Sequence, residues 1–310
     1  MSSIRFFTNA EVAAVLDYAG LIDALRSGLA HPGTAPNRQA YALPEGQASL
    51  LNMPVWQKGQ GIGVKLVTVF PENSQRDLPS VAAVFALFDD VTGQPLALME
   101  ASELTARRTA CTSALAADYL ARRDALSLTI VGTGTLAAHM VRAHTAVRDY
   151  SRIEIWGRDY SKAKALAERL QGEGYPISAS DNLAQSVGHA DVVTCVTTSR
   201  EPLVLGEWLN PGCHLDLVGA FLPSMRETDS AAVARARIVV DTCEGALEEA
   251  GDLLFALGDG VIQESDLNTE LRHVLQGDGV RSDDQEITLF KSVGYAVEDL
   301  LAAQYLLHNM

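Results

Sequence analysis

The spacing of hydrophobic residues changes along the chain, and the first 123 residues or so have the spacing of short strands. One helix precedes these strands, because Thr8 is a favoured capping residue and apolar residues follow it at helical spacing. The alanine-rich stretch 106–121 predicts a second helix. Strands are predicted at 48–53, 63–70, 81–89 and 95–99, with a hairpin turn at 90–93, where Asp and Gly tolerate the turn conformation.

From residue 125 onward, apolar runs of strand length alternate with helical stretches. Strands are predicted at 127–131, 152–156, 191–196, 214–218 and 238–240, and helices at 136–147 and, capped by Ser161, up to residue 170. This alternation is typical of an α/β protein whose parallel sheet is covered by helices. The apolar positions of 289–307 predict one long final helix, which we expect to return to the first domain.

Length, charge and cysteine content narrow the classes of function. A chain of 310 residues is long enough for two domains. The net charge of −15 argues against nucleic acid as a partner, because phosphate binding needs clustered Lys and Arg. No apolar run is long enough to span a membrane, and no secretory signal precedes the first helix, so no membrane partner is expected. Four scattered cysteines without a CxxC pair favour reduced thiols in a cytoplasm over disulfides or a metal site.

A glycine-rich loop between the first strand and the first helix of the second part carries the clearest chemistry. It reads Gly132-Thr133-Gly134-Thr135-Leu136-Ala137. In a GxGxxA loop of this kind, the first glycine allows the sharp turn and the second lets the backbone approach a pyrophosphate. The helix N-terminus then stabilises the anionic phosphates. The alternative is a structural turn that binds nothing, and the strand-turn-helix-strand context favours a dinucleotide site.

The end of the next strand indicates which nicotinamide cofactor binds. Enzymes that use NAD place an acid there to accept hydrogen bonds from the ribose 2′-hydroxyl, but this strand ends Ile155-Trp156-Gly157-Arg158. Arg158 can pair with a 2′-phosphate through its planar guanidinium, and Lys162 is close in sequence. In the alternative interpretation Arg158 is a solvated loop residue and Asp159 is the acid that binds NADH. We favour NADPH, because Asp159 comes after the tip of the strand.

Basic residues in the first part are candidates for binding an anion. Lys65 lies inside an otherwise apolar strand, Arg38 precedes the first strand, and Arg108 is predicted to open the small-residue helix, where an anion would be favoured. Spacing alone favours a solvated surface position for each of the three. No hydrolytic triad is supported, because no serine has a GxSxG context. His139 and His144 are five residues apart and are interpreted as packing or surface residues.

Six segments in order along almost the whole chain resemble the ornithine cyclodeaminase/μ-crystallin family. They are Gly63-Val64-Lys65-Leu66-Val67-Thr68-Val69-Phe70-Pro71, Leu104-Thr105-Ala106-Arg107-Arg108-Thr109-Ala110, the glycine loop, Ile155-Trp156-Gly157-Arg158, Gly219-Ala220-Phe221-Leu222-Pro223-Ser224-Met225-Arg226-Glu227, and Phe290-Lys291-Ser292-Val293-Gly294. Six segments in the same order are far more specific than any one of them.

The resemblance implies a doubly wound Rossmann domain, residues 124–289, inserted in an α+β domain for substrate binding and dimerisation, residues 1–123 with 290–310. It implies a homodimer. It also implies that Lys65 and Arg108, with Arg38, hold a substrate carboxylate beside the nicotinamide, which overturns the surface interpretation. By the same resemblance the cofactor-binding residues include Ser80, Arg108, Thr109, Val196, Thr197 and Ser292, beside Gly132 to Leu136, Gly157 and Arg158.

One position separates the chemistries of the family. Ornithine cyclodeaminases carry a catalytic aspartate where this chain has Phe221, and the acid that they carry before Met53-Pro54 is replaced by Leu51. Phenylalanine cannot transfer a proton. The segment around Phe221 is similar to that of the ketimine reductases, which reduce Δ1-pyrroline-2-carboxylate and Δ1-piperideine-2-carboxylate to proline and pipecolate.

The sequence therefore predicts an NADPH-dependent reductase of cyclic imino acids. In this hypothesis Phe221 packs against the substrate ring, and Lys65 is the candidate catalytic residue for proton transfer. Three alternatives stay open: an amino-acid dehydrogenase such as alanine dehydrogenase, an ornithine cyclodeaminase, and a non-catalytic NADPH-dependent binding protein of the μ-crystallin kind. The intact Lys65 and Arg108 argue for catalysis.

Overall fold

The chain divides into two compact units. A computed structural model describes residues 4–44, 48–76, 78–277 and 281–310. Unit 1 comprises Met1–Thr109 with Tyr295–Met310, and unit 2 comprises Ala110–Gly294. The sequence predicts boundaries after residues 123 and 289. The first is later in the chain than the division after Thr109, and the second is earlier than the division after Gly294. The first division falls inside one continuous helix, α3 (Ser102–Leu120), so no break in local structure marks it in the sequence.

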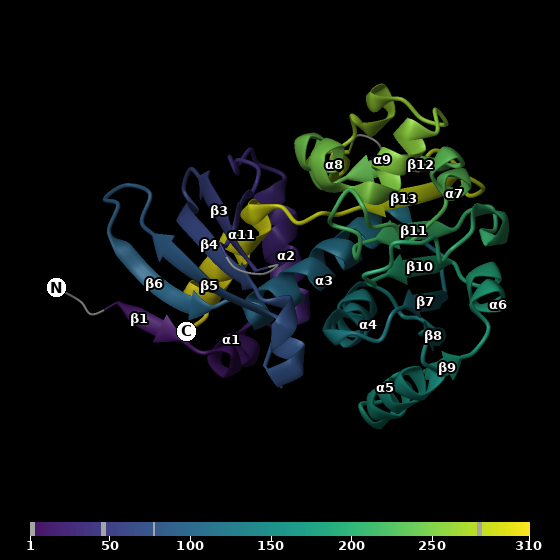
Figure 1. Cartoon of the computed structure of the whole chain (residues 1–310), viewed down its shortest axis with the longest axis horizontal. Coiled ribbons are helices and arrows are strands. Elements are labelled where there is room, and N and C mark those ends of the chain that lie inside the picture. Colours follow the sequence, from purple (N-terminus) through teal and green to yellow (C-terminus); the bar gives the residue numbers. More distant parts are fainter. Residues whose placement is uncertain (1–3, 45–47, 77, 278–280) are drawn as a thin grey trace. The chain divides into compact units, whose positions relative to one another are not determined.

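Unit 1 is built on a mainly antiparallel sheet of six strands in the order β1-β6-β5-β4-β3-β2 (Figure 1). Its helices are α1 (Asn9–Val15), α2 (Tyr18–Leu29) and α11 (Ala296–His308), with a 3-10 helix at Pro71–Arg76, and α11 packs on α2 and on the central strands. The strands are β1 (Arg5–Phe7), β2 (Gln39–Ala42), β3 (Ser49–Gln57), β4 (Gly61–Val69), β5 (Val81–Phe88) and β6 (Pro95–Glu100).

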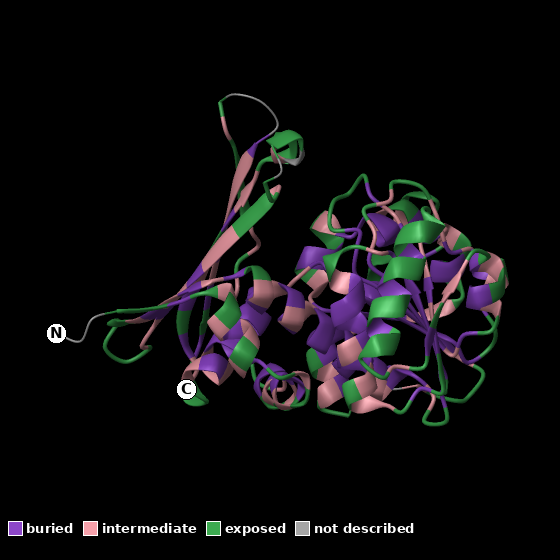
Figure 2. Ribbon diagram, turned by 90° about the horizontal axis from the view of Figure 1, so that it is seen from below, coloured by how far each residue is buried: buried purple, intermediate pink, exposed green. Residues whose placement is uncertain are grey.

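The two faces of this sheet differ in burial, as β4 shows. Its buried residues are Gly61, Gly63, Lys65 and Val67, whereas Ile62 and Leu66 between them are exposed. The alternation follows from the two-residue repeat of a strand. Helix α11 therefore covers one face, and the other leaves apolar side chains accessible; Figure 2 shows exposed and intermediate residues along these strands. The predicted β5–β6 hairpin is confirmed, with Gly93 at a φ of +68°.

Unit 2 is a Rossmann domain with a parallel sheet of seven strands in the order β12-β13-β11-β10-β7-β8-β9. The chain runs outward from β7 to β9 and then returns to the other side of β7 at β10, so the winding direction switches between these neighbours. In such sheets ligands bind at the carboxyl ends of the strands beside the switch point. The strands are β7 (Ser127–Val131), β8 (Arg152–Trp156), β9 (Ile177–Ser180), β10 (Val192–Cys195), β11 (His214–Leu217), β12 (Ala236–Val240) and β13 (Ile287–Lys291).

The helices of unit 2 connect these strands (Figure 1). They are α4 (Thr135–Val147), α5 (Tyr160–Gly172), α6 (Leu183–Gly188), α7 (Ser230–Ala234), α8 (Cys243–Glu249), α9 (Gly251–Gly258) and α10 (Leu271–Leu275), with 3-10 helices at Gly206–Trp208 and Glu264–Leu267 and the second part of α3. No helix in the described ranges is long and apolar enough to cross a membrane.

Three sequence predictions of local structure are wrong. The long helix expected at 289–307 is strand β13 followed by α11, because β13 is buried on both faces and lacks the alternation of a half-exposed strand. The first helix of the chain ends at Val15, and Asp17 caps a new helix, α2. Helix α5 is capped by Asp159 and not by Ser161, since the Asp159 carboxylate accepts the N–H of Ser161 at 3.0 Å.

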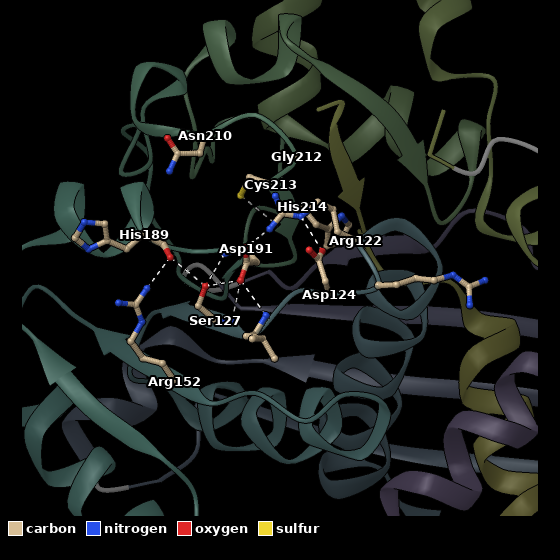
Figure 3. Close-up of polar contacts among 12 residues, drawn as sticks. Arg122, Asp124, Ser127, Arg152, His189, Asp191, Asn210, Gly212, Cys213 and His214 are labelled. Carbon is tan, nitrogen blue, oxygen red and sulfur yellow. Dashed lines mark hydrogen bonds and ion pairs between the residues drawn. The ribbon is translucent and has the colours of Figure 1, made fainter. Parts of the chain in front are cut away.

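A polar network fastens the amino-terminal ends of β7 and β10 (Figure 3). One carboxylate oxygen of Asp191 accepts the N–H groups of Leu126 and Ser127 at 2.9 and 3.0 Å and the Ser127 hydroxyl at 2.7 Å. The other oxygen pairs with Arg122, which follows α3. The network lies at the sheet edge opposite to the carboxyl ends, so its role is to hold α3 and two central strands in register.

Candidate active site

The glycine loop joins β7 to α4 at the carboxyl edge of the sheet, as predicted. Gly132 has a φ of +131°, and a Cβ atom there would lie 2.9 Å from the carbonyl oxygen of Val196. Gly134 is the N-cap residue of α4 and supplies no side-chain hydrogen bond to the helix. A Cβ atom on Gly134 would meet nothing within 4 Å. The start of α4 thus presents uncapped backbone N–H groups to open space, which fits a pyrophosphate.

The tip of β8 lies against this loop. A Cβ atom on Gly157 would lie 2.6 Å from a methyl carbon of Thr133, so only glycine fits without a shift. Arg158 follows and is exposed. Hydrogen bonds from Ser161, as well as the neighbouring Lys162, lower the pKa of Asp159. Asp159 is therefore engaged in capping α5, while Arg158 is accessible at the position where a 2′-phosphate is expected.

The ends of β10 and β11 bring further predicted residues to the same edge. Val196 and Thr197 directly follow β10, and the loop after β11 carries Phe221, whose side chain is 41% exposed. Sequence reasoning overlooked the role of Glu227, a fully buried acid. Its two carboxylate oxygens accept the N–H groups of Thr197 and Gly219 at 2.6 and 2.7 Å.

Ser292 lies just after β13, next to the C-terminal boundary of unit 2. Its hydroxyl donates to the carboxylate of Asp241 at 3.0 Å, and the same oxygen accepts the N–H groups of Val293 and Gly294 at 2.7 Å each. Asp241 therefore fixes the segment that carries Ser292. The predicted cofactor residues of unit 2 thus follow the carboxyl ends of β7, β8, β10 and β13.

In unit 1 the structure brings Lys65 and Arg108 together around two acids of α11. The Lys65 ammonium lies 2.6 Å from one carboxylate oxygen of Asp299, and Arg108 Nε lies 2.8 Å from the other. Arg108 also binds Glu298 at 2.6 Å. All four side chains are buried. The surface interpretation of Lys65 and Arg108 from spacing alone is therefore wrong.

The two acids were not predicted, and Arg108 is placed differently from the prediction. It lies in the second turn of α3, which begins at Ser102, so no helix N-terminus assists it. Glu298 and Asp299 lie in the first turn of α11, among apolar residues that cover the sheet. Two adjacent acids in an apolar helix were the available signal, because buried acids need cationic partners.

Burial and neighbouring charges set the protonation of this cluster. Burial lowers the pKa of Lys65 to about 8, against the effect of Asp299 and with help from the positive charges of Arg108 and Arg38. Burial alone would raise the pKa of Asp299, but Arg108 and Lys65 outweigh it and hold that pKa below its ordinary value. The cluster therefore contains an ionised acid and a lysine that can lose its proton near neutral pH.

The remaining predicted residues of unit 1 flank these elements. Arg38 precedes β2 and is partly buried, and its charge acts on Lys65. Ser80 precedes β5, and its carbonyl oxygen accepts the N–H of Phe70 at 2.7 Å. Thr109 follows Arg108 in α3 and is partly buried.

A third cluster has the residue types of a hydrolytic triad but lies in the core of unit 2. Ser113 Oγ is 3.0 Å from His144 Nε2 and also bonds to Asp216, as does Thr194. These four residues are fully buried, so a substrate cannot reach the serine. The cluster is a structural network that joins α3 and α4 to the sheet. Over the residues with described placement, no group of three or more His, Cys, Asp or Glu could hold a metal.

A family model and a relative match the chain over nearly its whole length. The family model of the ornithine cyclodeaminase/mu-crystallin family matches residues 6–310. The chain is 36% identical to the Δ1-pyrroline-2-carboxylate reductase of Paracoccus denitrificans, over all of this chain and 98% of that protein.

Two solved structures extend the similarity to the whole fold. The Δ1-pyrroline-2-carboxylate reductase of Thermococcus litoralis, in complex with NADH and L-proline, superposes with a TM-score of 0.94 at 32% identity, covering 99% of this chain and 97% of that one. An archaeal alanine dehydrogenase dimer with bound NAD superposes with a TM-score of 0.92 at 29% identity, covering 99% and 95%.

Proposed function

The chain belongs to the ornithine cyclodeaminase/mu-crystallin family, and from this premise we propose that it reduces cyclic imino acids with a nicotinamide cofactor. The products are the corresponding cyclic amino acids, proline from Δ1-pyrroline-2-carboxylate and pipecolate from Δ1-piperideine-2-carboxylate. The observation that carries the proposal is the buried cluster of Lys65 and Arg108 in a chain whose Rossmann unit presents an uncapped glycine loop. Phe221 at the cyclodeaminase aspartate position argues against loss of ammonia from ornithine.

The residues of unit 1 bind and orient the substrate in this proposal. When bound, the cofactor supplies a hydride to the carbon of the C=N bond, and a proton must reach the nitrogen. Arg108 and Lys65, with Arg38, hold the substrate carboxylate and so fix the orientation of the ring. Lys65 is the proposed proton donor, because its pKa of about 8 leaves it protonated at neutral pH yet able to release a proton. Phe221 covers the ring and excludes water.

The residues of unit 2 hold the cofactor. The N–H groups at the start of α4 bind the pyrophosphate, and Val196, Thr197 and Ser292 flank the nicotinamide. We propose NADPH in preference to NADH, because Arg158 is exposed at the tip of β8 and Asp159 is engaged in capping α5. The four cysteines are all free, which supports a reducing compartment such as the cytoplasm as the site of action.

We also propose that the protein forms a homodimer through the uncovered face of the six-stranded sheet. Apolar residues of the adjacent strands β3, β4 and β5 are accessible on this face. Trp56, Ile62 and Leu66 are exposed, and Val84 is partly exposed. A continuous apolar surface of this kind is typical of an interface. A second copy is the occupant because a two-fold contact between identical sheets covers the face of both.

A panel of substrates tests the reaction. With NADPH, we expect kcat/KM for Δ1-pyrroline-2-carboxylate or Δ1-piperideine-2-carboxylate to exceed that for pyruvate plus ammonium by about 100-fold or more, since the site is proposed to hold a preformed ring imine. The measurement is the nicotinamide absorbance. A higher value with pyruvate would identify an amino-acid dehydrogenase, and ammonia release from ornithine a cyclodeaminase. If the protein oxidises NADPH with none of the imines, the result would favour a non-catalytic binding protein.

The pH dependence of the same assay tests Lys65. Only the ammonium form pairs with a carboxylate and donates a proton, so kcat/KM should be level below about pH 8 and fall about tenfold per pH unit above it. Lys65→Arg stays charged across this range, and its profile should lose the break near pH 8. Titration of the imine itself affects both proteins equally. Identical profiles for the two proteins would rule out Lys65 as the titrating group.

Substitution of Arg158 tests the choice of cofactor. Arg158→Ala removes the charged partner of the 2′-phosphate, so KM for NADPH should rise by roughly 10- to 100-fold, while KM for NADH changes less than about twofold. Lys164→Ala is the matched control, because Lys164 is an exposed cation of α5 paired only along the helix with Glu168. Equal effects of Arg158→Ala on both cofactors would contradict a 2′-phosphate contact.

A charge on the uncovered sheet face tests the dimer. Leu66 is 39% exposed at the centre of the face, and Leu66→Glu should convert the dimer to a monomer, measured by light scattering after gel filtration. Val91→Glu is the control, since Val91 is 86% exposed at the tip of the β5–β6 turn and lies off the face. A wild-type protein with the mass of one chain would refute the proposal.

A further inference from the structure

One buried acid joins the loops that follow β10 and β11. Glu227 uses both carboxylate oxygens, one for the N–H of Thr197 at 2.6 Å and the other for the N–H of Gly219 at 2.7 Å. The loops are also in direct backbone contact, since a Cβ atom on Gly219 would lie 2.0 Å from the carbonyl oxygen of Thr197. Because β10 and β11 are neighbours in the sheet, the two loops form one surface at its carboxyl edge.

A second acid and a lysine hold Glu227 itself in place. One oxygen of Asp252, in α9, accepts the backbone N–H groups of Glu227 and Thr228 at 2.6 and 3.1 Å. The other oxygen lies 3.1 Å from the ammonium of Lys291, the last residue of β13. All three charged side chains are completely buried. Lys291 thus pairs with Asp252 and acts on Glu227 through its charge, and the cluster carries a net negative charge when both acids are ionised.

A net charge in the core lowers the stability of the fold, and apolar residues in place of buried charges often stabilise a protein equally well. The geometry nevertheless needs the charged form of Glu227, because a neutral carboxylic acid would turn an O–H donor towards one of the two N–H donors. Burial and the Asp252 carboxylate raise the pKa of Glu227 to about 7, against the effect of Lys291 and of the Thr197 N–H. Cys195 on β10 is a further titratable neighbour, on which Asp216 of β11 also acts.

We propose that Glu227 is a positioning residue that holds the two loops in the shape that accepts the nicotinamide ring. This inference rests on the proposed function, in which Val196 and Thr197 lie beside that ring. Glu227 acts through the backbone of Thr197 and Gly219 and not by contact with the ring. The pyrophosphate and adenosine parts of the cofactor bind at the glycine loop and at the tip of β8, where Glu227 has no hydrogen bond.

Two ligands that differ in the nicotinamide ring measure the contribution of that ring to binding separately from the rest of the cofactor. NADPH and 2′-phospho-ADP-ribose share every group except the nicotinamide, so the ratio of their Kd values measures what the ring adds to binding. In Glu227→Gln the amide oxygen accepts one N–H, but the NH2 group cannot accept the other. We expect Kd for NADPH to rise about tenfold or more and Kd for 2′-phospho-ADP-ribose to change less than about twofold, both by isothermal titration calorimetry.

Controls separate this role from general support of the fold. Glu207→Gln removes an exposed acid of unit 2 and should change neither Kd. Glu227→Asp keeps the charge but is too short to reach both N–H groups, so it should show the same loss confined to NADPH, and it serves if the Gln variant does not fold. Equal losses for both ligands, or no loss for either, would overturn the proposal.

The pH dependence gives a second readout that a purely structural role would not move. Protonation of Glu227 removes an acceptor, so in the wild type the affinity added by the ring should increase as pH rises through about 7. The 2′-phosphate titrates in both ligands and cancels in the ratio. Glu227→Gln should give a flat ratio. If NADH binds more tightly than NADPH, the same comparison uses NADH and ADP-ribose.

The outcomes distinguish this inference from the proposed function. A wild-type protein that gains affinity from the nicotinamide ring but reduces no imine would refute the proposed substrate and leave the role of Glu227 standing. If the wild-type protein binds NADPH no more tightly than 2′-phospho-ADP-ribose, the ring adds nothing to affinity. That result would refute the role of Glu227, even if the enzyme were active.

Discussion

Burying a cation requires an acid beside it, and this constraint shapes unit 1. Lys65 and Arg108 lie on the covered face of the sheet and in α3, and the acids that neutralise them come from the other end of the chain. The return of residues 295–310 to the first unit is therefore a requirement of charge as well as of packing. The same acids hold both basic side chains in one place, which is where the proposed function has them bind a substrate carboxylate.

Unit 2 also buries charged side chains, but there the acids outnumber the cation. Asp252 pairs with Lys291, and the second acid, Glu227, accepts backbone N–H groups from the loops after two adjacent strands. Asp241 does the same for the segment after β13, and Asp191 for the start of β7. Loops at strand ends cannot complete a sheet ladder, so their N–H groups need acceptors from side chains. For the N–H groups named here those acceptors are carboxylates.

The two edges of the parallel sheet of unit 2 therefore have different roles. At the amino-terminal edge of the parallel sheet, the Asp191 network holds the start of β7 and the residue after α3 (Figure 3). The carboxyl edge carries glycines at the positions of closest approach and an uncapped helix start, which leaves donors for a ligand. The serine, histidine and aspartate of the buried triad-like cluster are all occupied in holding helices to the sheet, so residue types alone would have suggested the wrong chemistry.

The sequence by itself determined what depends on neighbours along the chain. It predicted the strand-turn-helix of the glycine loop, the four strands β3 to β6 of unit 1 with the β5–β6 hairpin, and the α/β class with a parallel sheet, because turn residues and apolar periodicity are local. Strands β1 and β2 were not predicted. Only the tertiary structure decided that Lys65 and Arg108 are buried, that Glu298 and Asp299 neutralise them, and that Glu227 joins two loops. These contacts join residues far apart in sequence, up to 234 positions for Lys65 and Asp299, and no local pattern encodes such a pairing. Strand β13 was missed for a related reason: a strand buried on both faces has no alternation, and only its place between β11 and β12 distinguishes it from a helix.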